Sequence, residues 1–186
     1  MKKIFLIILI SSFALSAFAQ EKNEEAKIEW MSFEEAIEAN ATDQKKFFID
    51  VYTDWCGWCK RMDATTFQNK AIIELLNESY HPVKLDAEMK DTVRLGKDVF
   101  VNEKPNQKRN PHQLAIALLN GKLSYPSVVF LDEQGNMIQP LAGYQKAEGL
   151  EPILSFFAED RHLEEGADFE KYLKNYKSKA NREKPN

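Results

Sequence analysis

The chain has 186 residues, of which 44% are hydrophobic and 11% aromatic, and its formal net charge is −4 at pH 7. This length is typical of one domain, and the apolar content is sufficient for a core, which excludes a chain that is disordered throughout. The mild acidity gives no reason to expect a nucleic-acid partner, because proteins that bind nucleic acids present a basic surface.

Residues 1–19 have the pattern of a secretory signal peptide. Lysines follow Met1, an almost unbroken apolar run extends to Phe18, and Ala17 and Ala19 place small residues where a signal peptidase cleaves. We predict cleavage after Ala19, a periplasmic or secreted protein, and no stable membrane insertion after cleavage. An uncleaved membrane anchor is disfavoured, because the run is shorter than the about 20 apolar residues that span a bilayer.

The residues after the cleavage site are predicted to begin with a flexible, charged lead-in over 20–27, followed by a domain over 28–160. A short strand is expected over residues 28–31. Ser32 and Glu35 then match a capping box, in which each side chain caps the backbone of the other residue, so a helix is expected to begin there.

Both cysteines of the chain follow a predicted strand. The segment KKFFIDVY, residues 45–52, is apolar and rich in β-formers, which predicts a strand buried on both faces. Helical character resumes after Asp54, so Cys56 is expected at a helix N-terminus, where backbone N–H groups and the helix dipole favour a negatively charged sulfur. Because a thiolate is the attacking species in thiol–disulfide exchange, we expect Cys56 to be the nucleophile and Cys59, one turn further, to resolve the mixed disulfide.

Other uses of two closely spaced cysteines fit this sequence less well. A purely structural disulfide between them would close almost no loop and would constrain the unfolded chain little. A closed zinc site needs four ligands, and the histidines, His81, His112 and His162, show no paired spacing. Covalent haem attachment needs a histidine directly after the second cysteine, where Lys60 stands. We therefore expect a cysteine pair that opens and closes, with no metal and no dissociable cofactor.

The next elements are predicted from periodicity and turn residues. Apolar residues at helical spacing predict a helix over 71–79. Residues 92–102 alternate around Gly96 and Lys97, which predicts a β-hairpin. A polar loop follows, and Asn110 is expected to cap a helix whose first residue is Pro111. This hairpin and helix could be ordinary packing, or they could help to recognise a partner.

The last part of the chain is predicted to contain two strands and two helices. The strands are expected over 128–131 and 137–140, and the first helix over about 147–160. Pro152 is tolerated in that helix only near its first turn, because proline lacks a backbone N–H. Residues 161–186 are expected to form an extra C-terminal helix and a disordered tail, and an apolar stripe at helical spacing marks the helix: Phe169, Tyr172, Leu173 and Tyr176.

The chain resembles the thioredoxin superfamily over roughly residues 28–160. It is similar to exported thioredoxin-like proteins and to the C-terminal domain of the membrane thiol:disulfide interchange reductase. Besides the cysteine pair, matches to the superfamily occur in order at Asp50, Trp55, Lys60, Lys84, Pro126 and Gly143. The resemblance implies the α/β thioredoxin fold, a central mixed β-sheet flanked by helices, and a cis peptide bond before Pro126.

The resemblance also implies catalytic roles. Asp50 matches the buried acid beneath the disulfide, so we expect it to have a raised pKa and to accept the proton of Cys59. Lys84 matches a lysine near that acid, and Lys60 matches the lysine after the resolving cysteine, where it would tune the redox pair together with Gly57. Alternatively, Asp50 is a carboxylate at the strand end that is exposed to water, and Lys84 is a solvated strand residue without a catalytic role.

For substrate binding, the resemblance implies a surface beside the cysteines. Trp55 and Trp58 would form its apolar rim, unless they belong to the core. An extended client segment would pair with the backbone of Tyr125, the residue before Pro126, in the manner of an added strand.

Three features depart from the thioredoxin pattern. Gly57-Trp58 stands where thioredoxins have Gly-Pro, which leaves the reduction potential open. Tyr125 replaces a smaller residue. Residues 88–125 exceed the usual short connection before the cis-proline loop and are expected to form an insert. We expect a thiol:disulfide oxidoreductase that acts on protein disulfides and an unidentified redox partner, as a reductant rather than an oxidant. The alternative is a binding module or holdase of the same fold without redox turnover.

Overall fold

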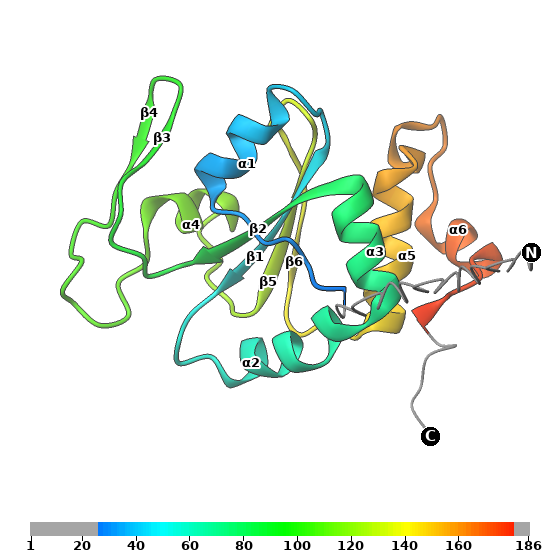
Figure 1. Ribbon diagram of the computed structural model, residues 1–186, viewed down its shortest axis with the longest axis horizontal. Helices are drawn as coiled ribbons and strands as arrows, with labels where there is room; N and C mark the ends of the chain where they lie inside the picture. Colours follow the sequence, from blue (N-terminus) through cyan, green and yellow to red (C-terminus); the bar gives the residue numbers. More distant parts are fainter. Residues whose placement is uncertain (1–25, 181–186) are drawn as a thin grey trace, which may run out of the picture.

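The computed structural model of this protein describes residues 26–180 (Figure 1). The predicted signal peptide, most of the predicted lead-in and the tail from Asn181 lie outside the described residues. Within residues 26–180, no helix is long and apolar enough to cross a membrane.

A four-stranded mixed sheet forms the centre of the domain (Figure 1). Its strands, in the spatial order β2-β1-β5-β6, are β2 (Tyr80–Asp86), β1 (Lys46–Tyr52), β5 (Ser127–Leu131) and β6 (Met137–Ala142). β1 pairs in parallel with β2 and antiparallel with β5, and β5 pairs antiparallel with β6. The parallel register places Asp50 directly opposite Lys84.

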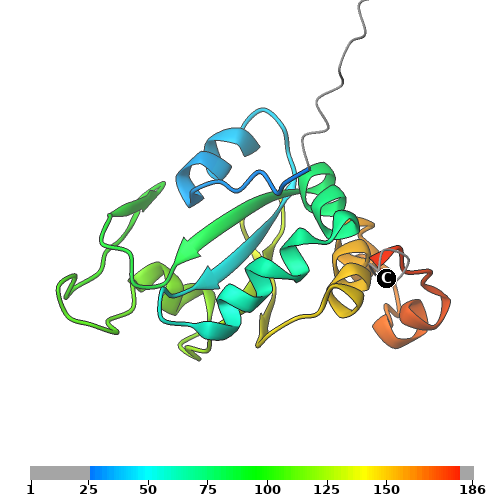
Figure 2. The ribbon, with the colours of Figure 1, turned by 60° about the horizontal axis from the view of Figure 1, so that its bottom comes forward.

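Helices cover both faces of the sheet (Figures 1 and 2). One face carries α1 (Phe33–Asn40) and α4 (Gln113–Leu118), and the other carries α2 (Gly57–Ala64), α3 (Lys70–Ser79) and α5 (Ala147–Ala158). The short 3-10 helices η1 (Thr66–Gln68) and η2 (Arg161–Leu163) follow α2 and α5, and α6 (Phe169–Asn175) packs beyond α5. The predicted α/β thioredoxin fold, with an extra C-terminal helix, is confirmed.

Strand β1 is buried on both faces, as predicted. Phe47, Ile49 and Val51 belong to the core beneath α1 and α4, whereas Phe48 belongs to the core beneath α3 and α5. Because side chains alternate along a strand, Asp50 points to the same face as Phe48. Its carboxylate therefore lies within an apolar layer, and the residue is only 1% exposed.

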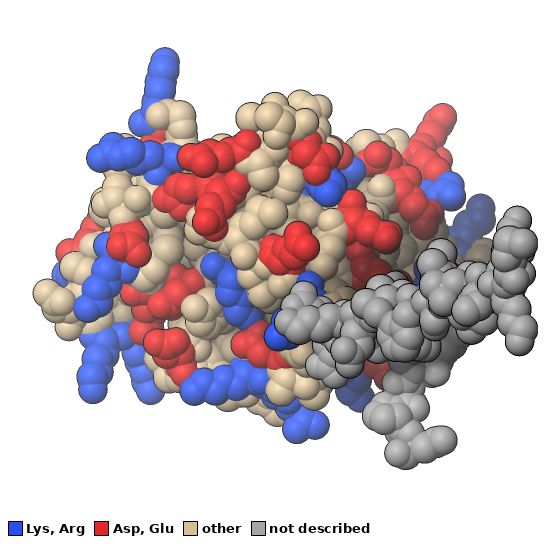
Figure 3. Space-filling model, in the orientation of Figure 1, with Lys and Arg blue, Asp and Glu red and all other residues tan. Residues whose placement is uncertain are grey.

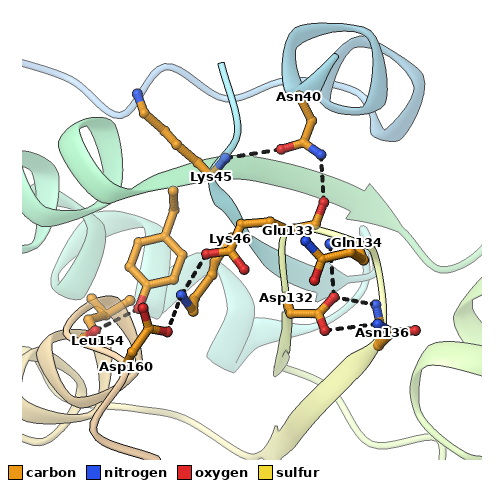
Figure 4. A network of polar contacts seen from close by, with 10 residues as sticks. Asn40, Lys45, Lys46, Asp132, Glu133, Gln134, Asn136, Leu154 and Asp160 are labelled. Atoms are coloured by element: carbon orange, nitrogen blue, oxygen red, sulfur yellow. Dashed lines mark hydrogen bonds and ion pairs between the residues drawn. The ribbon is translucent and has the colours of Figure 1, made fainter. Parts of the chain in front are cut away.

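A polar network closes the sheet at the end where β1 begins (Figure 4). The ammonium group of Lys46 lies 2.7 Å from the Glu133 carboxylate and 2.6 Å from that of Asp160. Asn40 joins α1 to the β5–β6 turn by donating to the Glu133 backbone carbonyl at 2.8 Å. Lys46 is buried, so removing either carboxylate would leave a buried charge partly uncompensated.

The predicted first strand, residues 28–31, is wrong. Only Met31 forms a β-bridge, with Val83. The side chain of Asn77 takes the backbone groups that a longer ladder would need: it accepts from the Glu29 N–H at 3.0 Å and donates to the Lys27 carbonyl at 2.8 Å. The capping box that starts α1 directly afterwards is present as predicted.

The insert contains the predicted hairpin, but its helix begins later than expected. The hairpin strands are β3 (Val93–Leu95) and β4 (Asp98–Phe100). α4 begins at Gln113, so the predicted cap at Asn110 is wrong. The Asn110 side-chain amide donates instead to the Asn102 side chain at 2.5 Å, and His112 caps the helix by accepting from the Leu114 N–H at 3.1 Å.

One expectation for the C-terminal part also needs correction. Pro152 lies in the second turn of α5, not near its first turn, and its burial indicates that packing offsets the missing hydrogen bond. The apolar stripe on α6 packs against α5 only in part. Phe169 and Tyr172 each lie 5.2 Å from Phe156 between ring centroids, whereas Leu173 is 47% exposed.

Candidate active site

Cys56 and Cys59 lie at the junction of β1 and α2, and they form a disulfide bond. Cys56 is the N-cap residue of α2, which confirms its predicted position at the start of a helix. Its Sγ atom accepts a hydrogen bond from the Cys59 backbone N–H at 3.0 Å. A reduced Cys56 in this position would have its thiolate stabilised by that N–H group and by the helix dipole.

A groove of about 250 Å³ is lined in part by Trp58, which lies between the two cysteines in the sequence. It is lined by residues from α2, the loop before β5 and the loop after β6: Trp58, Tyr125, Pro126, Gly143 and Tyr144. The peptide bond between Tyr125 and Pro126 is cis, as the resemblance implied. The cysteines themselves are buried, Cys56 to 4% exposure and Cys59 to 2%, so a client sulfur would have to approach Cys56 through this surface.

Trp58 forms one side of this surface and is 59% exposed. Its ring lies 5.4 Å from the ring of Tyr144, and the guanidinium of Arg61 lies 5.9 Å from its centroid. The Tyr144 hydroxyl is hydrogen-bonded to the Thr65 hydroxyl at 3.0 Å. These contacts hold two aromatic rings at the surface, where they can cover an apolar part of a client.

Trp55 forms the other side and is 51% exposed. Its indole N–H donates to the Glu88 carboxylate at 3.0 Å, and its ring meets Tyr125 edge to face at 5.9 Å. The Arg109 guanidinium lies 5.1 Å from the Trp55 ring centroid. All three contacts come from residues 88–125, so the insert holds Trp55 in place. Both tryptophans are surface residues and not part of the core.

Beneath this surface, Asp50 is paired with a lysine. Lys84 Nζ lies 2.6 Å from Asp50 Oδ2, and it also contacts Asp63 Oδ1. The lysine is surrounded by aromatic rings, with Trp30 at 5.0 Å and Tyr52 at 5.1 Å from its nitrogen. The structure therefore brings together the predicted acid and lysine and adds a second, more exposed carboxylate.

Burial is the main influence on the charge of Asp50. It raises the pKa of Asp50 to about 6, because Lys84 only partly offsets the desolvation of the carboxylate, while the negative charge of Asp63 adds to the increase. Asp50 Oδ1 is buried and has no hydrogen-bond partner within the described part of the chain. Burial opposes the charge of Lys84 as well, but its two carboxylate partners outweigh that effect and raise its pKa.

The remaining predicted tuning residues, Gly57 and Lys60, are exposed on α2. The Lys60 side chain makes no hydrogen bond or ion pair within residues 26–180, so it does not join the group around Asp50. Nothing lies within 4 Å of the position that a Cβ atom on Gly57 would take, so space does not require a glycine there.

Sequence reasoning missed four residues of this site: Asp63, Glu88, Arg109 and Tyr144. Asp63 and Cys59 are four residues apart on one helix, and this spacing places both side chains on the same helix face. The spacing could have identified Asp63 from the sequence. Tyr144 directly follows Gly143. No local pattern points to Glu88 or Arg109, because only the folded insert brings them to Trp55.

The described residues 26–180 contain no group of three or more His, Cys, Asp or Glu side chains that could hold a metal ion. The site brings together the disulfide of Cys56 and Cys59 and the ion pair of Asp50 and Lys84.

Comparisons with known proteins agree with this geometry. Residues 33–158 match the family described as thioredoxin-like domain. The chain is 26% identical over 127 residues to the disulfide bond reductase DsbH of Chlamydia pneumoniae, which covers 67% of this chain and 68% of that protein.

Solved structures show the same fold. A structure described as DsbH oxidoreductase matches with a TM-score of 0.50 and 21% identity, over 76% of this chain and 92% of its own. A thioredoxin-fold protein from Helicobacter pylori matches with a TM-score of 0.54 and 19% identity, over 70% of this chain and 81% of its own.

The chain belongs to the thioredoxin-like domain family. With its Cys-x-x-Cys disulfide at the start of a helix, it is a thiol-disulfide oxidoreductase.

Proposed function

We propose that this protein reduces disulfide bonds of other proteins outside the cytoplasm. The observation that carries the proposal is the hydrogen bond from the Cys59 N–H to Cys56 Sγ at the start of α2, because this position favours a thiolate on Cys56. The name of the relative from Chlamydia pneumoniae, a disulfide bond reductase, supports the direction of electron flow. The export pattern of residues 1–19 supports the location.

The reaction is an exchange between sulfurs. The Cys56 thiolate attacks a client disulfide, forms a mixed disulfide and releases one client sulfur as a thiolate. The Cys59 thiolate then attacks Cys56 Sγ, which forms the Cys56–Cys59 disulfide and releases the second client thiolate. The client gains two electrons and the protein loses two. A second dithiol protein, the unidentified redox partner, would return the electrons, so no dissociable cofactor is needed.

Asp50 is the proposed base for the second step. Its pKa of about 6 lies close to neutral, so its ionised form can accept the proton of Cys59. The unpartnered Oδ1 atom offers a place for that proton. Lys84 would keep enough of the carboxylate ionised for it to act as a base, since it contacts the other oxygen at 2.6 Å.

The client segment is proposed to bind along the groove between Trp55 and Trp58. The backbone N–H and C=O of Tyr125 make no hydrogen bond within residues 26–180, so they can pair with an extended segment in strand fashion. The rings of Trp58, Tyr125 and Tyr144 would cover the apolar side chains of that segment.

Insulin reduction tests the proposal. Cys56→Ser should abolish the reduction of insulin disulfides in the presence of dithiothreitol, because the attacking sulfur is lost. Cys59→Ser is the matched control: it keeps the attacking sulfur and should accumulate a mixed disulfide that mass spectrometry detects. If Cys56→Ser reduces insulin as fast as the wild type, the protein is a binding module or holdase without redox turnover.

Two further measurements test direction and location. A reduction potential near about −270 mV would agree with a reductant, and one near about −120 mV would mark an oxidant. Fractionation of the native host should recover a mature protein that begins after Ala19 outside the cytoplasm. A full-length protein in the cytoplasm would contradict the proposed location.

A further inference from the structure

The insert loop, residues 101–110, is held by one buried asparagine. Asn102 is 7% exposed, and its side-chain amide donates to the backbone carbonyls of Met89 at 3.2 Å and Asn110 at 3.0 Å, with a longer contact to Glu88 at 3.4 Å. Its side-chain oxygen accepts from the Lys104 N–H at 3.1 Å. This network joins the first residues of the insert to the end of the loop.

Both ends of this network adjoin residues that contact Trp55. Glu88, at one end, accepts the indole N–H. Arg109, directly before Asn110 at the other end, has a φ of 58°, a left-handed backbone that non-glycine residues seldom adopt. The Asn102 network holds the chain in this conformation and brings the guanidinium over the Trp55 ring. The charge of Arg109 is therefore positioned at the rim of the active site by a built network.

The N–H groups of the Arg109 guanidinium are available for hydrogen bonds to a ligand. Within the described residues, no carboxylate lies within 4.0 Å of Arg109, and its N–H groups donate no hydrogen bond to the protein. Glu88, the acidic residue that contacts the same ring, accepts the Trp55 indole N–H through Oε1 and makes no ion pair with Arg109 within the described residues. Lys104 and Lys108 add positive charge to the same loop. Figure 3 shows lysine and arginine side chains projecting from the end of the molecule where the insert lies, with acidic side chains between them.

We propose that the insert is a client-recognition element in which Arg109 binds a carboxylate of the client close to its target cysteine. This inference rests on the proposed function, since it concerns the clients of the same site. The guanidinium lies over the Trp55 ring, with its Cζ atom 5.1 Å from the ring centroid, and its N–H groups remain free to pair with both oxygens of a carboxylate. A client with Asp or Glu beside its cysteine would be preferred over one with Lys or Arg.

A pair of disulfide-linked peptides tests this preference. The two peptides are identical except for Glu or Lys next to the target cysteine, and each is reduced by the reduced protein under steady-state conditions. The wild type should reduce the Glu peptide with a kcat/KM about two- to fivefold higher, the range of an exposed ion pair, mainly through KM. The preference should shrink as salt is added.

Variants locate the effect. Arg109→Glu should reverse the preference, and Asn102→Ala should weaken it, because the loop is released while Arg109 keeps its charge. Lys97→Glu, in the hairpin turn of the same insert, makes the same change of net charge as Arg109→Glu, so it is the matched control and should leave the ratio unchanged. Circular dichroism and the reduction of a small uncharged disulfide verify that each variant is folded and active.

The outcomes separate the two proposals. If the wild type reduces neither peptide nor the small disulfide, the proposed function fails. If it reduces both peptides with equal kcat/KM, or if Arg109→Glu leaves the ratio unchanged, only the recognition by Arg109 is overturned. An equal change in Arg109→Glu and Lys97→Glu would also overturn it, because the effect would then reflect net charge and not the position on Trp55.

Discussion

Asp50 and Glu151 are two carboxylates that are each 1% exposed, yet their surroundings shift their pKa values in opposite directions. Asp50 lies beneath the disulfide, where burial raises its pKa to about 6. Glu151 lies on α5, where burial also opposes ionisation, but hydrogen bonds outweigh it and lower its pKa.

The donors around each carboxylate explain the difference. Glu151 accepts from the Ser178 hydroxyl at 2.5 Å and from the backbone N–H groups of Lys179 at 2.8 Å and Ala180 at 2.9 Å. Asp50 has only Lys84, which it shares with Asp63, and one of its oxygens has no partner among the described residues.

This comparison separates a buried carboxylate whose oxygens are fully hydrogen-bonded from one that has an unpartnered oxygen within the described residues. The ionised Glu151 carboxylate accepts hydrogen bonds at both oxygens and anchors residues 178–180 to α5. These bonds lower its pKa, so Glu151 stays ionised near neutral pH. Burial raises the pKa of Asp50 to about 6, so this carboxyl group can gain or lose a proton near neutral pH, as its proposed role as a base requires. Both side chains are buried, but several hydrogen-bond donors favour the ionised form of Glu151, whereas Asp50 has one lysine that it shares with the negatively charged Asp63.

The largest expected effect is on turnover in Asp50→Asn. Removing the base should slow insulin reduction by about 100-fold at pH 7, because an amide cannot accept the proton of Cys59. The same change should raise the free energy of unfolding at pH 8 by about 1–3 kcal/mol, since a buried charge is removed and each pKa unit corresponds to about 1.4 kcal/mol. Stopped-flow assays and denaturant unfolding measure the two. Unchanged turnover would remove Asp50 from the mechanism.

Glu151→Ala should act in the opposite sense. It leaves the hydroxyl and two N–H donors without their buried acceptor, so the free energy of unfolding should fall by about 2–4 kcal/mol. Insulin reduction by the folded fraction should stay at the wild-type rate. Hydrogen exchange should show that the amides of Lys179 and Ala180 lose protection first. Retained protection at these amides would contradict the anchoring role.

Stability should depend on pH with opposite signs at the two sites. Between about pH 4 and 6 the folded protein holds a proton on Asp50 that the unfolded chain has released, so this site's contribution falls by about 1–3 kcal/mol as pH rises. The Glu151 contribution is present above its ordinary pKa of 4.5 and is lost as pH falls below that value. Unfolding of the oxidised protein at a series of pH values measures both slopes.

Single variants assign those slopes. Asp50→Asn should abolish the decline between about pH 4 and 6, and Glu151→Gln should abolish the loss at lower pH. A decline that persists in Asp50→Asn would mean that another group causes it.

The smallest effect is expected in Asp63→Asn. Without the second carboxylate, Lys84 pairs with Asp50 alone, and the pKa of Asp50 should fall because the charge of Asp63 contributes to its increase. The turnover rate at pH 7 should change by only about two- to threefold, and the acidic limb of the pH–rate profile should move to lower pH. Glu170→Gln, on exposed α6, is the control for the loss of one negative charge. A profile that does not move would show that Asp63 is not coupled to Asp50.

The parts of the site that could be predicted depend on short stretches of chain. The buried strand before the cysteines and the helix that Cys56 caps each follow from a pattern of a few residues, whereas the cis-proline loop is expected from the resemblance to the thioredoxin superfamily. The cap of α4 could not be predicted in this way. Asn110 is a good capping residue, but Asn102, on the other side of the loop, pairs with its side chain, and His112 takes its place.

By itself, the sequence determined that two sulfurs lie one turn apart at the start of a helix, behind a strand that carries a buried acid. These features rest on backbone propensities and spacing, which act between neighbours along the chain. Only the tertiary structure decided which charges and rings surround them. Lys84 meets Asp63 across 21 positions, Trp55 meets Glu88 across 33, and Glu151 meets Ala180 across 29. Such contacts depend on how strands, helices and the insert pack together, because no local pattern encodes which distant residue fills a given space.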